Sequence, residues 1–408
     1  MKLRAVTLFV EPNFDPAAAA AFFSAARTAF HLPVQTVRLA TTPFPTWWSE
    51  REPVISQAQS VAGRWRAAGA EYISLGPVQL DHDSAWLERL PELLAATDVL
   101  FASVEIAAGG QVDVERCWRM ARVIQEVSQL QANGFGNLYL AALANCPPGS
   151  PFFPVAYHGG GPAVFALAVE AADLALAAGQ AAGSLTEARR HLVESIETEA
   201  ARLATAAQAL AAAHDIAFGG LDFSLAPYPT AEASLAGAME ALGLPWVGAA
   251  GSLFAAAFIT EAIGRARFPR CGFSGLMLPV LEDAVLAQRA AEGRLTINDL
   301  LSYAAVCGVG LDTIPLPGDV SQATLAGILL DTAALALRLD KPLTARLMPL
   351  PGLAVGDEVR FDFPYFANSR VMAAGPGVQG LLSQAVRLTL TPYPLSPRGR
   401  GDERPSPA

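Results

Sequence analysis

The chain carries the stretch LSYAAVCGVGLDTIPLPGDVS at residues 301–321, and the fold can be read outward from it. A helical pattern that begins at Ile297 runs into this stretch, and Cys307 then stands directly before two closely spaced glycines. Glycine tolerates backbone conformations that are closed to other residues, whereas Pro315 and Pro317 fix φ and remove amide donors. The pattern predicts a shaped loop that presents one thiol, and such loops carry function more often than plain surface connections do.

Composition sets the size class of the protein and limits its partners. The 408 residues are 52% hydrophobic, which is ample material for a large core. Acidic residues number 38 against 28 basic ones, for a net charge of −10. Binding to nucleic acid or to an anionic membrane requires a basic patch. We therefore expect neither of these partners and a small-molecule ligand instead, and a homo-oligomer is left open.

Cysteine usage and the N-terminus indicate the compartment. The four cysteines are widely spaced and form no Cys-x-x-Cys pair, so the sequence predicts neither a disulfide framework nor a metal site. The apolar run after Met1 ends at Glu11 and Pro12, which is too short for the hydrophobic region of a signal peptide. A buried first strand and a cytoplasmic location are the better interpretation.

Strand and helix patterns alternate from residue 4 to residue 144, which favours an α/β domain with helices on the faces of a sheet. Residues 163–213 read as almost continuous helix. Neither an internal repeat nor a clear linker interrupts the chain, so we expect one α/β domain at residues 1–388. Residues 389–408 are rich in Pro, Arg, Gly and Ser, and we expect a disordered tail because they cannot bury enough apolar surface.

A glycine turn follows His158 in the segment YHGGG at residues 157–161. It resembles the oxyanion-hole segment of lipases and esterases, but that chemistry also needs a GxSxG nucleophile turn, which the chain lacks. What remains is a turn that feeds the helix expected from residue 163, whose dipole would favour an anionic ligand near His158. The three-glycine fingerprint of dinucleotide-binding folds is also missing, so no cofactor can be named.

The candidate residues also have ordinary structural explanations. A free cysteine such as Cys307 is usually a buried, inert, small apolar residue, and reactivity needs a partly exposed, electropositive setting. Asp312 can hold a loop by accepting backbone amide bonds. Glu282 stands with Asp283 at the start of a helical pattern, where carboxylates suit the helix dipole.

Several motifs resemble those of a bacterial and archaeal family, domain-of-unknown-function family 711. The segment AVCGVGLD at residues 305–312, followed by PGD at 317–319, carries the resemblance. Further matching segments are FFPVAYHG at 152–159, DFSLAP at 222–227, SGLMLPVLED at 274–283 and RLMPLPG at 346–352. The resemblance therefore spans nearly the whole chain up to about residue 372.

This resemblance implies a barrel related to pyruvate formate-lyase and ribonucleotide reductase, in which a loop carries a cysteine into the centre of ten strands. Cys307 would occupy the tip of that loop. Glycyl-radical enzymes carry Arg-Val-x-Gly near the C-terminus, whereas this chain has RVMAAG at residues 370–375, with Ala373 in place of the glycine. A CxxxCxxC motif for an iron–sulfur cluster is absent as well. We therefore do not expect a glycyl-radical enzyme that works by itself.

Two functions remain open. The first is an enzyme that acts on a small polar or anionic metabolite through Cys307, with Asp312 and His158 as further catalytic candidates. The second is a non-catalytic, metabolite-binding regulatory protein on a degenerate radical-enzyme barrel. The candidates for substrate binding lie at strand ends and glycine turns, the usual places for ligand contacts in α/β folds. They are Asp222, Ser224, Ser274, Glu282, Gly308, Thr313, Asn368 and Arg370.

Convergence on Cys307 is the sharpest of these expectations. His158 or Arg370 should share one pocket with the Cys307 sulfur. Asp312 or Asp222 should supply a carboxylate to the same pocket. An arginine in that position would bind a carboxylate or phosphate through two hydrogen bonds and would lower the pKa of a nearby thiol.

Overall fold

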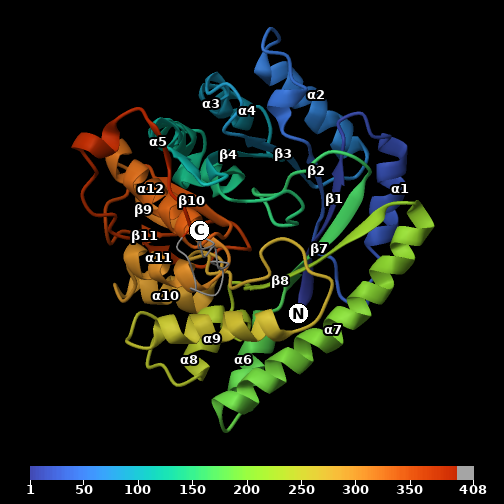
Figure 1. Ribbon diagram of the computed structural model, residues 1–408, viewed down its shortest axis with the longest axis vertical. Helices are drawn as coiled ribbons and strands as arrows, with labels where there is room; N and C mark the ends of the chain where they lie inside the picture. Colours follow the sequence, from blue (N-terminus) through green and yellow to red (C-terminus); the bar gives the residue numbers. More distant parts are fainter. Residues whose placement is uncertain (393–408) are drawn as a thin grey trace, which may run out of the picture.

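A large sheet organises the fold, and helices lie around the outside of its strands (Figure 1). The computed structural model describes residues 1–392, so residues 393–408 of the expected tail lie outside the described residues. In chain order the strands are β1 (Lys2–Val10), β2 (Val37–Thr41), β3 (Tyr72–Val78), β4 (Leu100–Ala108), β5 (Gln111–Asp113), β6 (Leu140–Ala144), β7 (Val164–Glu170), β8 (Ala217–Ala226), β9 (Gly310–Pro317), β10 (Leu343–Leu350), β11 (Glu358–Val359), β12 (Ser369–Arg370) and β13 (Arg387–Thr389).

Helices follow most of the strands along the chain. They are α1 (Pro16–Ala26), α2 (Val54–Ala67), α3 (Ala85–Glu88), α4 (Leu90–Ala95), α5 (Val114–Ser128), α6 (Ala172–Gln180), α7 (Leu185–His214), α8 (Leu235–Ala241), α9 (Ser252–Arg265), α10 (Ala284–Ala291), α11 (Ile297–Val306) and α12 (Gln322–Arg338). Short 3-10 helices are η1 (Phe44–Thr46), η2 (Ala132–Tyr139), η3 (Ala231–Ala233) and η4 (Gly380–Ser383). Within the described residues, no helix is both long and apolar enough to cross a bilayer.

The main sheet has the strand order β8-β7-β1-β2-β3-β4-β6-β10-β9. The five strands β1, β2, β3, β4 and β6 run parallel to one another. At either end the direction reverses, because β7 is antiparallel to β1 and β10 is antiparallel to β6. This large, mostly parallel sheet with surrounding helices confirms the predicted α/β class.

The strands are apolar along most of their length because both of their faces are covered. β1 reads KLRAVTLFV and is buried throughout its second half, as parallel strands between two layers usually are. The face toward the helices forms the large core. The other face carries small residues, including Ala5, Ala141 and Ala168, and these contact the loop residues of 146–155 and 273–277. Small side chains therefore leave space on this inner face for chain segments.

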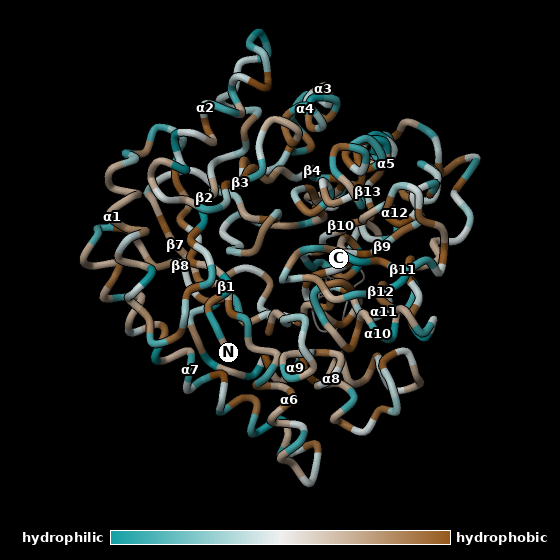
Figure 2. Tube along the Cα trace, turned by 180° about the vertical axis from the view of Figure 1, so that it is seen from behind, coloured by the Kyte–Doolittle hydropathy of each residue, from teal (hydrophilic) through white to brown (hydrophobic). Residues whose placement is uncertain are grey.

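The helices show the polarity expected of an outer layer. Figure 2 shows hydrophilic colouring along α5, at the periphery of the molecule. α5 nevertheless buries one side, which includes Cys117, Met120 and Ile124. A polar side chain that caps the first backbone amides marks the start of α10. Asp283 accepts hydrogen bonds from the first backbone amides of α10, which confirms the predicted helix start at this position.

A glycine is required where β9 begins. Gly310 has φ of +102°, and a Cβ atom there would lie 2.3 Å from the carbonyl oxygen of Thr344 on the neighbouring β10. Gly308 and Gly275 meet backbone to backbone, since a Cβ on Gly308 would lie 2.9 Å from the Gly275 Cα. These glycines allow the chain after α11 to pass between two backbones.

Two sequence expectations differ from the structure. Residues 164–170 form strand β7 rather than the start of a long helix. A short run that is apolar in all but its last residue cannot be assigned by periodicity alone. Much of the loop expected at 301–321 is strand β9, which pairs with β10 on one side. Pro315 and Pro317 lack amide donors, and they are accommodated because β9 is the last strand of the sheet order.

One segment between α9 and α10 lies beside both end strands of the sheet. Arg270 forms an isolated bridge with Leu221 of β8, and Pro279 forms one with Asp312 of β9. The Val280 amide donates to the Asp312 carbonyl at 3.0 Å. Residues 270–280 thus contact β8 at one end and β9 at the other.

Candidate functional site: an arginine-lined cavity

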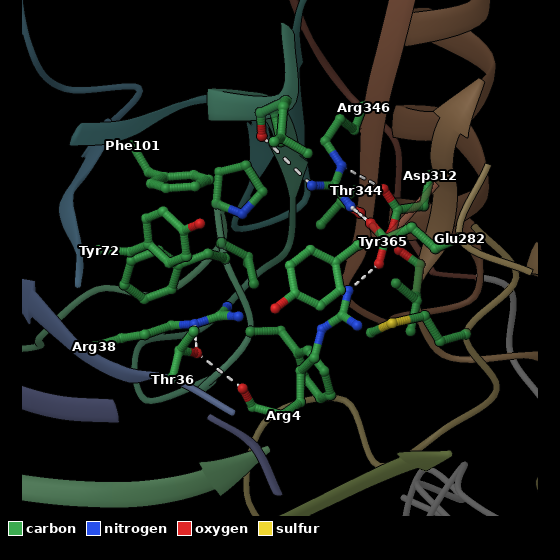
Figure 3. Close-up of a pocket in the computed structure, with 18 of the residues that line it drawn as sticks. Arg4, Thr36, Arg38, Tyr72, Phe101, Glu282, Asp312, Thr344, Arg346 and Tyr365 are labelled. Carbon is green, nitrogen blue, oxygen red and sulfur yellow. Dashed lines mark hydrogen bonds and ion pairs between the residues drawn. The ribbon is translucent and has the colours of Figure 1, made fainter. Parts of the chain in front are cut away.

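A cavity of about 80 Å³ lies among β1, β2, β9 and β10, and that volume exceeds what one water molecule needs. Its lining is partly polar and partly aromatic. The polar and charged lining residues are Arg4, Gln35, Thr36, Arg38, Glu282, Asp312, Thr344 and Arg346, and the aromatic ones are Tyr72, Phe101, Phe152, Phe153, Phe273, Phe363 and Tyr365. Figure 3 shows Arg38 and Tyr72 on one side, facing Glu282 and Asp312 on the other.

A chain of buried ion pairs forms one wall of the cavity. Arg4 of β1 contacts both Glu170 of β7, at 3.3 Å, and Glu282. Arg346 of β10 then contacts Glu282 at 2.8 Å and Asp312 of β9 at 2.5 Å. The five side chains alternate in charge, so each cation lies between two carboxylates. Such pairing allows these charges to remain away from water.

Arg38 is the exception to this pairing. It is 9% exposed, and its Nε donates to the Thr36 hydroxyl at 2.8 Å. Its guanidinium lies near the rings of Tyr72 and Phe153, with centroids 5.6 Å and 5.2 Å away. Among residues 1–392, neither Nη1 nor Nη2 has a carboxylate or other acceptor within hydrogen-bond distance. Burial, together with the charge of Arg4, lowers the pKa of Arg38 to about 10.

Thr36 fixes the orientation of this arginine. Its hydroxyl accepts from Arg38 Nε and donates to the Arg4 carbonyl oxygen at 2.9 Å, so β1 and β2 jointly position the guanidinium. The Nη1–Nη2 edge is left toward the cavity. A guanidinium edge of this kind matches the two oxygens of a carboxylate or the oxygens of a phosphate.

The three arginines of the lining differ in how their charges are compensated. Arg4 and Arg346 alternate with three carboxylates, those of Glu170, Glu282 and Asp312, so the acids equal the arginines of this region in number although Glu170 is not itself a lining residue. Arg38 nevertheless has no ion-pair partner of its own among residues 1–392. Its free edge, and not a net positive charge, makes the cavity suited to an anion.

Asp312 also has unused hydrogen-bonding capacity. Arg346 donates to its Oδ1, whereas no residue within 1–392 donates to its Oδ2. Burial raises the pKa of Asp312, and the adjacent Arg346 opposes that rise. Glu282 differs, because each of its oxygens accepts from an arginine. Asp312 thus presents the carboxylate oxygen that is available to a ligand.

Cys307, the main catalytic candidate of the sequence analysis, does not line this cavity. It ends α11, is 1% exposed, and its amide donates to the Tyr303 carbonyl at 2.8 Å. Burial raises the pKa of the thiol, and the charge of Lys341 opposes the rise. Lys341 itself donates to the backbone carbonyls of Ala304 and Cys307. The neighbouring Val309 reaches the cavity lining, but the thiol is packed in the core.

Asp222, Ser224 and Ser274 form a separate buried cluster. Asp222 accepts hydrogen bonds from the Ser224 hydroxyl at 2.5 Å and from the amides of Phe273 and Ser274 at 2.8 and 2.9 Å. Burial raises the pKa of Asp222 to about 6. These contacts hold the 273–277 segment against β8, and none of the three side chains lines the cavity.

The other candidate residues lie apart from the cavity. Arg370 is on β12, in a two-stranded ribbon outside the main sheet; its side chain is 47% exposed and donates to the Gly356 carbonyl. Asn368 is exposed. Thr313 is buried on β9, where its hydroxyl accepts from the Leu281 amide at 3.2 Å. Gly308 packs against backbone, as described above.

His158 is buried, and its Nε2 lies 3.1 Å from the Gly161 carbonyl oxygen. Because strand β7 follows in place of the expected helix, the helix-dipole argument for an anion near His158 does not hold. The expected convergence therefore differs from the structure. Only Asp312 and Glu282, of all the candidates, come together in the cavity.

Sequence reasoning missed the three arginines of the cavity. Arg4, Arg38 and Arg346 each stand within a strand that is mostly apolar. Arginine is rarely buried unless it is paired, so an arginine inside such a strand indicates an internal ion pair or a polar cavity. The sequence therefore shows that these arginines are unusual, although it does not show which carboxylates they contact. No group of three His, Cys, Asp or Glu side chains within residues 1–392 is placed to hold a metal ion.

Known relatives match the chain over most of its length. A UPF0210 protein of Pyrobaculum arsenaticum is 38% identical over 286 residues, which are 67% of this chain and 62% of that relative. The chain thus covers under two thirds of that relative. A UPF0210 protein of Clostridium perfringens is 29% identical over 369 residues, 85% of this chain and 81% of the relative. One from Methanosarcina acetivorans is 30% identical over 355 residues, with coverage of 82% and 76%.

The family described as "Uncharacterised ACR (DUF711)" matches residues 17–368. That range contains the cysteine–glycine motif at 305–312, both carboxylates of the cavity, and two of its three arginines, Arg38 and Arg346. The chain belongs to this family, domain-of-unknown-function family 711.

Proposed function

We propose that the protein binds a small anionic metabolite in the arginine-lined cavity, with the anionic group on Arg38. The observation that carries this proposal is the free Nη1–Nη2 edge of a buried guanidinium. A buried charge without a partner is costly. A carboxylate or phosphate on that edge would remove the cost and would form two charge-assisted hydrogen bonds.

The rest of the lining supports a ligand with one negative charge and a flat apolar part. Arg38 is the one lining arginine without an ion-pair partner among residues 1–392, and it matches one anionic group. Tyr72, Phe153 and Tyr365 offer ring faces and edges, which favour aromatic or other flat apolar groups. Ligand cavities are commonly built in this way, with apolar walls and a few polar groups that fix orientation.

We propose in addition that residues 270–282 close the sheet into a barrel like that of pyruvate formate-lyase, with the cavity inside it. The bridges of Arg270 to β8 and of Pro279 to β9 support this closure, because β8 and β9 are the two ends of the sheet order. The ion pairs of Glu282 support it as well, since they join β1 to β10.

Isothermal titration with benzoate and with inorganic phosphate tests the binding proposal. Wild-type protein should release heat with at least one of the two anions, and Arg38→Met should abolish that heat. Arg360→Met is the matched control, because Arg360 is 73% exposed, pairs with Glu358 and does not line the cavity. The proposal fails if wild-type protein binds neither anion, or if Arg38→Met binds as well as the control does.

An enzyme that moves a proton on the bound anion is a second candidate, and Asp312 favours it. Its Oδ2 has no donor among the described residues, and the raised pKa of Asp312 suits a group that accepts and returns a proton. The Cys307 thiol is given no part in this candidate, because it does not line the cavity.

Deuterium exchange separates the enzyme from the purely binding protein. Pyruvate, whose methyl protons can be followed by NMR in D2O, is a suitable probe. Wild-type protein should accelerate the exchange, and Asp312→Asn should lose the acceleration while retaining the affinity for the anion. If wild-type protein binds pyruvate without accelerating exchange, the non-catalytic alternative is favoured for that class of acid.

A further inference from the structure

Asp312 is a second polar group of the cavity wall with hydrogen-bonding capacity left for a ligand. The residue is 7% exposed and lines the cavity, and its Oδ2, which has no donor among residues 1–392, retains accessible surface. The free edge of Arg38, a residue that is 9% exposed, lies on the other side of the cavity (Figure 3). Arg38 can only donate hydrogen bonds, whereas a carboxylate oxygen accepts them. The two walls therefore offer complementary polar groups.

The position of Asp312 does not depend on a ligand. Arg346 of β10 donates to its Oδ1 at 2.5 Å, and the Val280 amide donates to its backbone carbonyl at 3.0 Å. These contacts fix the carboxylate and leave Oδ2 open. A polar group that is already held in place loses little conformational freedom when a ligand binds to it.

Aromatic side chains supply much of the rest of the wall. Tyr72 and Phe153 lie beside the Arg38 guanidinium, and Phe273, Phe363 and Tyr365 also line the cavity. A flat ring can pack against such side chains through its face or its edge. The lining thus suits a ligand with an acid group, a flat ring and one further polar group.

We propose that the ligand is an aromatic acid that carries a hydroxyl group, and that the hydroxyl binds Asp312 Oδ2 while the acid group binds Arg38. The inference rests on the proposed function for the acid group, and it adds the identity of the polar group at the other end of the ligand.

A hydroxyl suits Asp312 better than an ammonium group does. Arg346 already compensates the charge of Asp312, and Arg4 pairs with the neighbouring Glu282. Both guanidinium groups would repel a ligand cation, but a neutral hydroxyl meets no such repulsion. Burial also raises the pKa of Asp312. A hydroxyl can donate to the carboxylate or accept from the protonated carboxyl group, so the contact forms in either state.

Hydroxybenzoates and fluorobenzoates provide matched ligands, because fluorine is close to a hydroxyl group in size but cannot donate a hydrogen bond. Isothermal titration should compare 4-hydroxybenzoate with 4-fluorobenzoate, and 3-hydroxybenzoate with 3-fluorobenzoate. In at least one pair the hydroxy acid should bind wild-type protein about tenfold more tightly, because the fluoro acid leaves Oδ2 without a donor. 4-(Aminomethyl)benzoate, which carries an ammonium group, should bind more weakly than that hydroxy acid does.

A variant of Asp312 assigns the preference to this side chain. Asp312→Asn should lose most of the preference for the hydroxy acid, because a neutral hydrogen bond replaces a charge-assisted one. Its affinity for the fluoro acid should be retained. Asp222→Asn is the matched control, since it also removes a buried carboxylate but Asp222 does not line the cavity. The control should keep the full preference.

The outcomes separate this inference from the proposed function. Equal binding within both pairs by wild-type protein overturns the hydroxyl assignment while the anion-binding proposal stands. A preference that is undiminished in Asp312→Asn, or tighter binding of the ammonium compound, overturns it as well. If inorganic phosphate binds wild-type protein but none of the aromatic acids does, this inference fails alone. If no anion binds, it fails together with the proposed function.

Discussion

Arg4 on β1 and Arg346 on β10 bind the two oxygens of one carboxylate, that of Glu282. Four strands, β2, β3, β4 and β6, separate β1 from β10 in the sheet order. One side chain thus joins distant strands, and it does so where all three groups are nearly excluded from water, at 12%, 8% and 8% side-chain exposure. The stability of the cavity wall should therefore depend on Glu282.

Replacing Glu282 by Gln should lower the free energy of unfolding by about 3 kcal/mol, because it leaves two buried arginines without a shared counter-charge. Urea denaturation followed by circular dichroism measures the change. Glu358→Gln is the control: Glu358 pairs with Arg360 and Arg370, but its side chain is 54% exposed. Exposed pairs contribute about 1 kcal/mol or less. Equal losses in the two variants would contradict the importance of the buried network.

Arg38→Met should affect stability in the opposite direction. Removing an unpaired buried cation and placing an apolar side chain among Tyr72 and Phe153 should raise the free energy of unfolding, by about 1 kcal/mol or more. The ligand-free variant should therefore unfold at a higher urea concentration than wild-type protein does. A clear loss of stability would mean that the contacts of the guanidinium with Thr36, Tyr72 and Phe153 outweigh the cost of burying its charge, and it would weaken the case for an anion site.

The Cys307 thiol should react slowly in the folded protein. Iodoacetamide attacks the thiolate, and burial both raises the pKa of Cys307 and shields its sulfur. At neutral pH the peptide that contains Cys307 should be alkylated at least about tenfold more slowly than in urea-unfolded protein, because the reagent cannot easily reach the buried sulfur and less of the thiol is ionised. Mass spectrometry of the peptides gives both rates. Rapid labelling of the folded protein would return Cys307 to the list of catalytic candidates.

Asp222 should make the protein less stable as pH rises from about 4 to about 6. Its pKa is near 3.8 when unfolded and about 6 in the folded protein, where burial raises it. Below both pKa values the two states are equally protonated, and between them only the folded state keeps the proton. The unfolded state is therefore favoured as pH increases, by up to about 3 kcal/mol.

The comparison that isolates this effect is the pH dependence of Asp222→Asn. Other buried carboxylates, including Glu170 and Asp283, also have raised pKa values and titrate in both proteins. The difference between wild-type protein and Asp222→Asn should therefore be measured by urea denaturation at pH 4 and pH 7. If the two proteins lose the same stability over that interval, Asp222 does not titrate as inferred.

Local sequence signals predicted the class of the fold well and the cavity only in part. β1 and α1 were recognisable because an apolar run precedes an alanine-rich segment that starts at Pro16, and in the structure Asp15 caps that helix. The Asp283 cap was equally local. β7 was missed, because its six consecutive apolar residues, which precede Glu170, suit a buried strand and a buried helix alike. Only its pairing with β1 and β8 decides between them.

The site could be anticipated only where its chemistry is local. Glu282 and Asp312 stood out as acidic residues beside strand and helix boundaries. The ion pairs of Arg4 and Arg346 depend on partners 34 to 278 residues away in the chain, and no short motif encodes them. Arg38 donates to nearby Thr36, but the rings beside its guanidinium belong to the distant Tyr72 and Phe153. Cys307 attracted attention because of the glycines around it. In the structure, Gly308 and Gly310 admit neighbouring backbones at 275 and 344, and these contacts alone account for them.

Adjacent carboxylates at Glu282 and Asp283 impose a length constraint on this part of the chain. Glu282 joins β1 to β10, while Asp283 accepts from the amides of Leu235 in α8 and Leu286 in α10. The carboxylate that joins the two strands and the carboxylate that joins the two helices thus belong to consecutive residues. An insertion of one residue between them would turn one carboxylate away from its partners. Relatives should therefore vary in sequence around this dipeptide but not in the number of residues between the two acids.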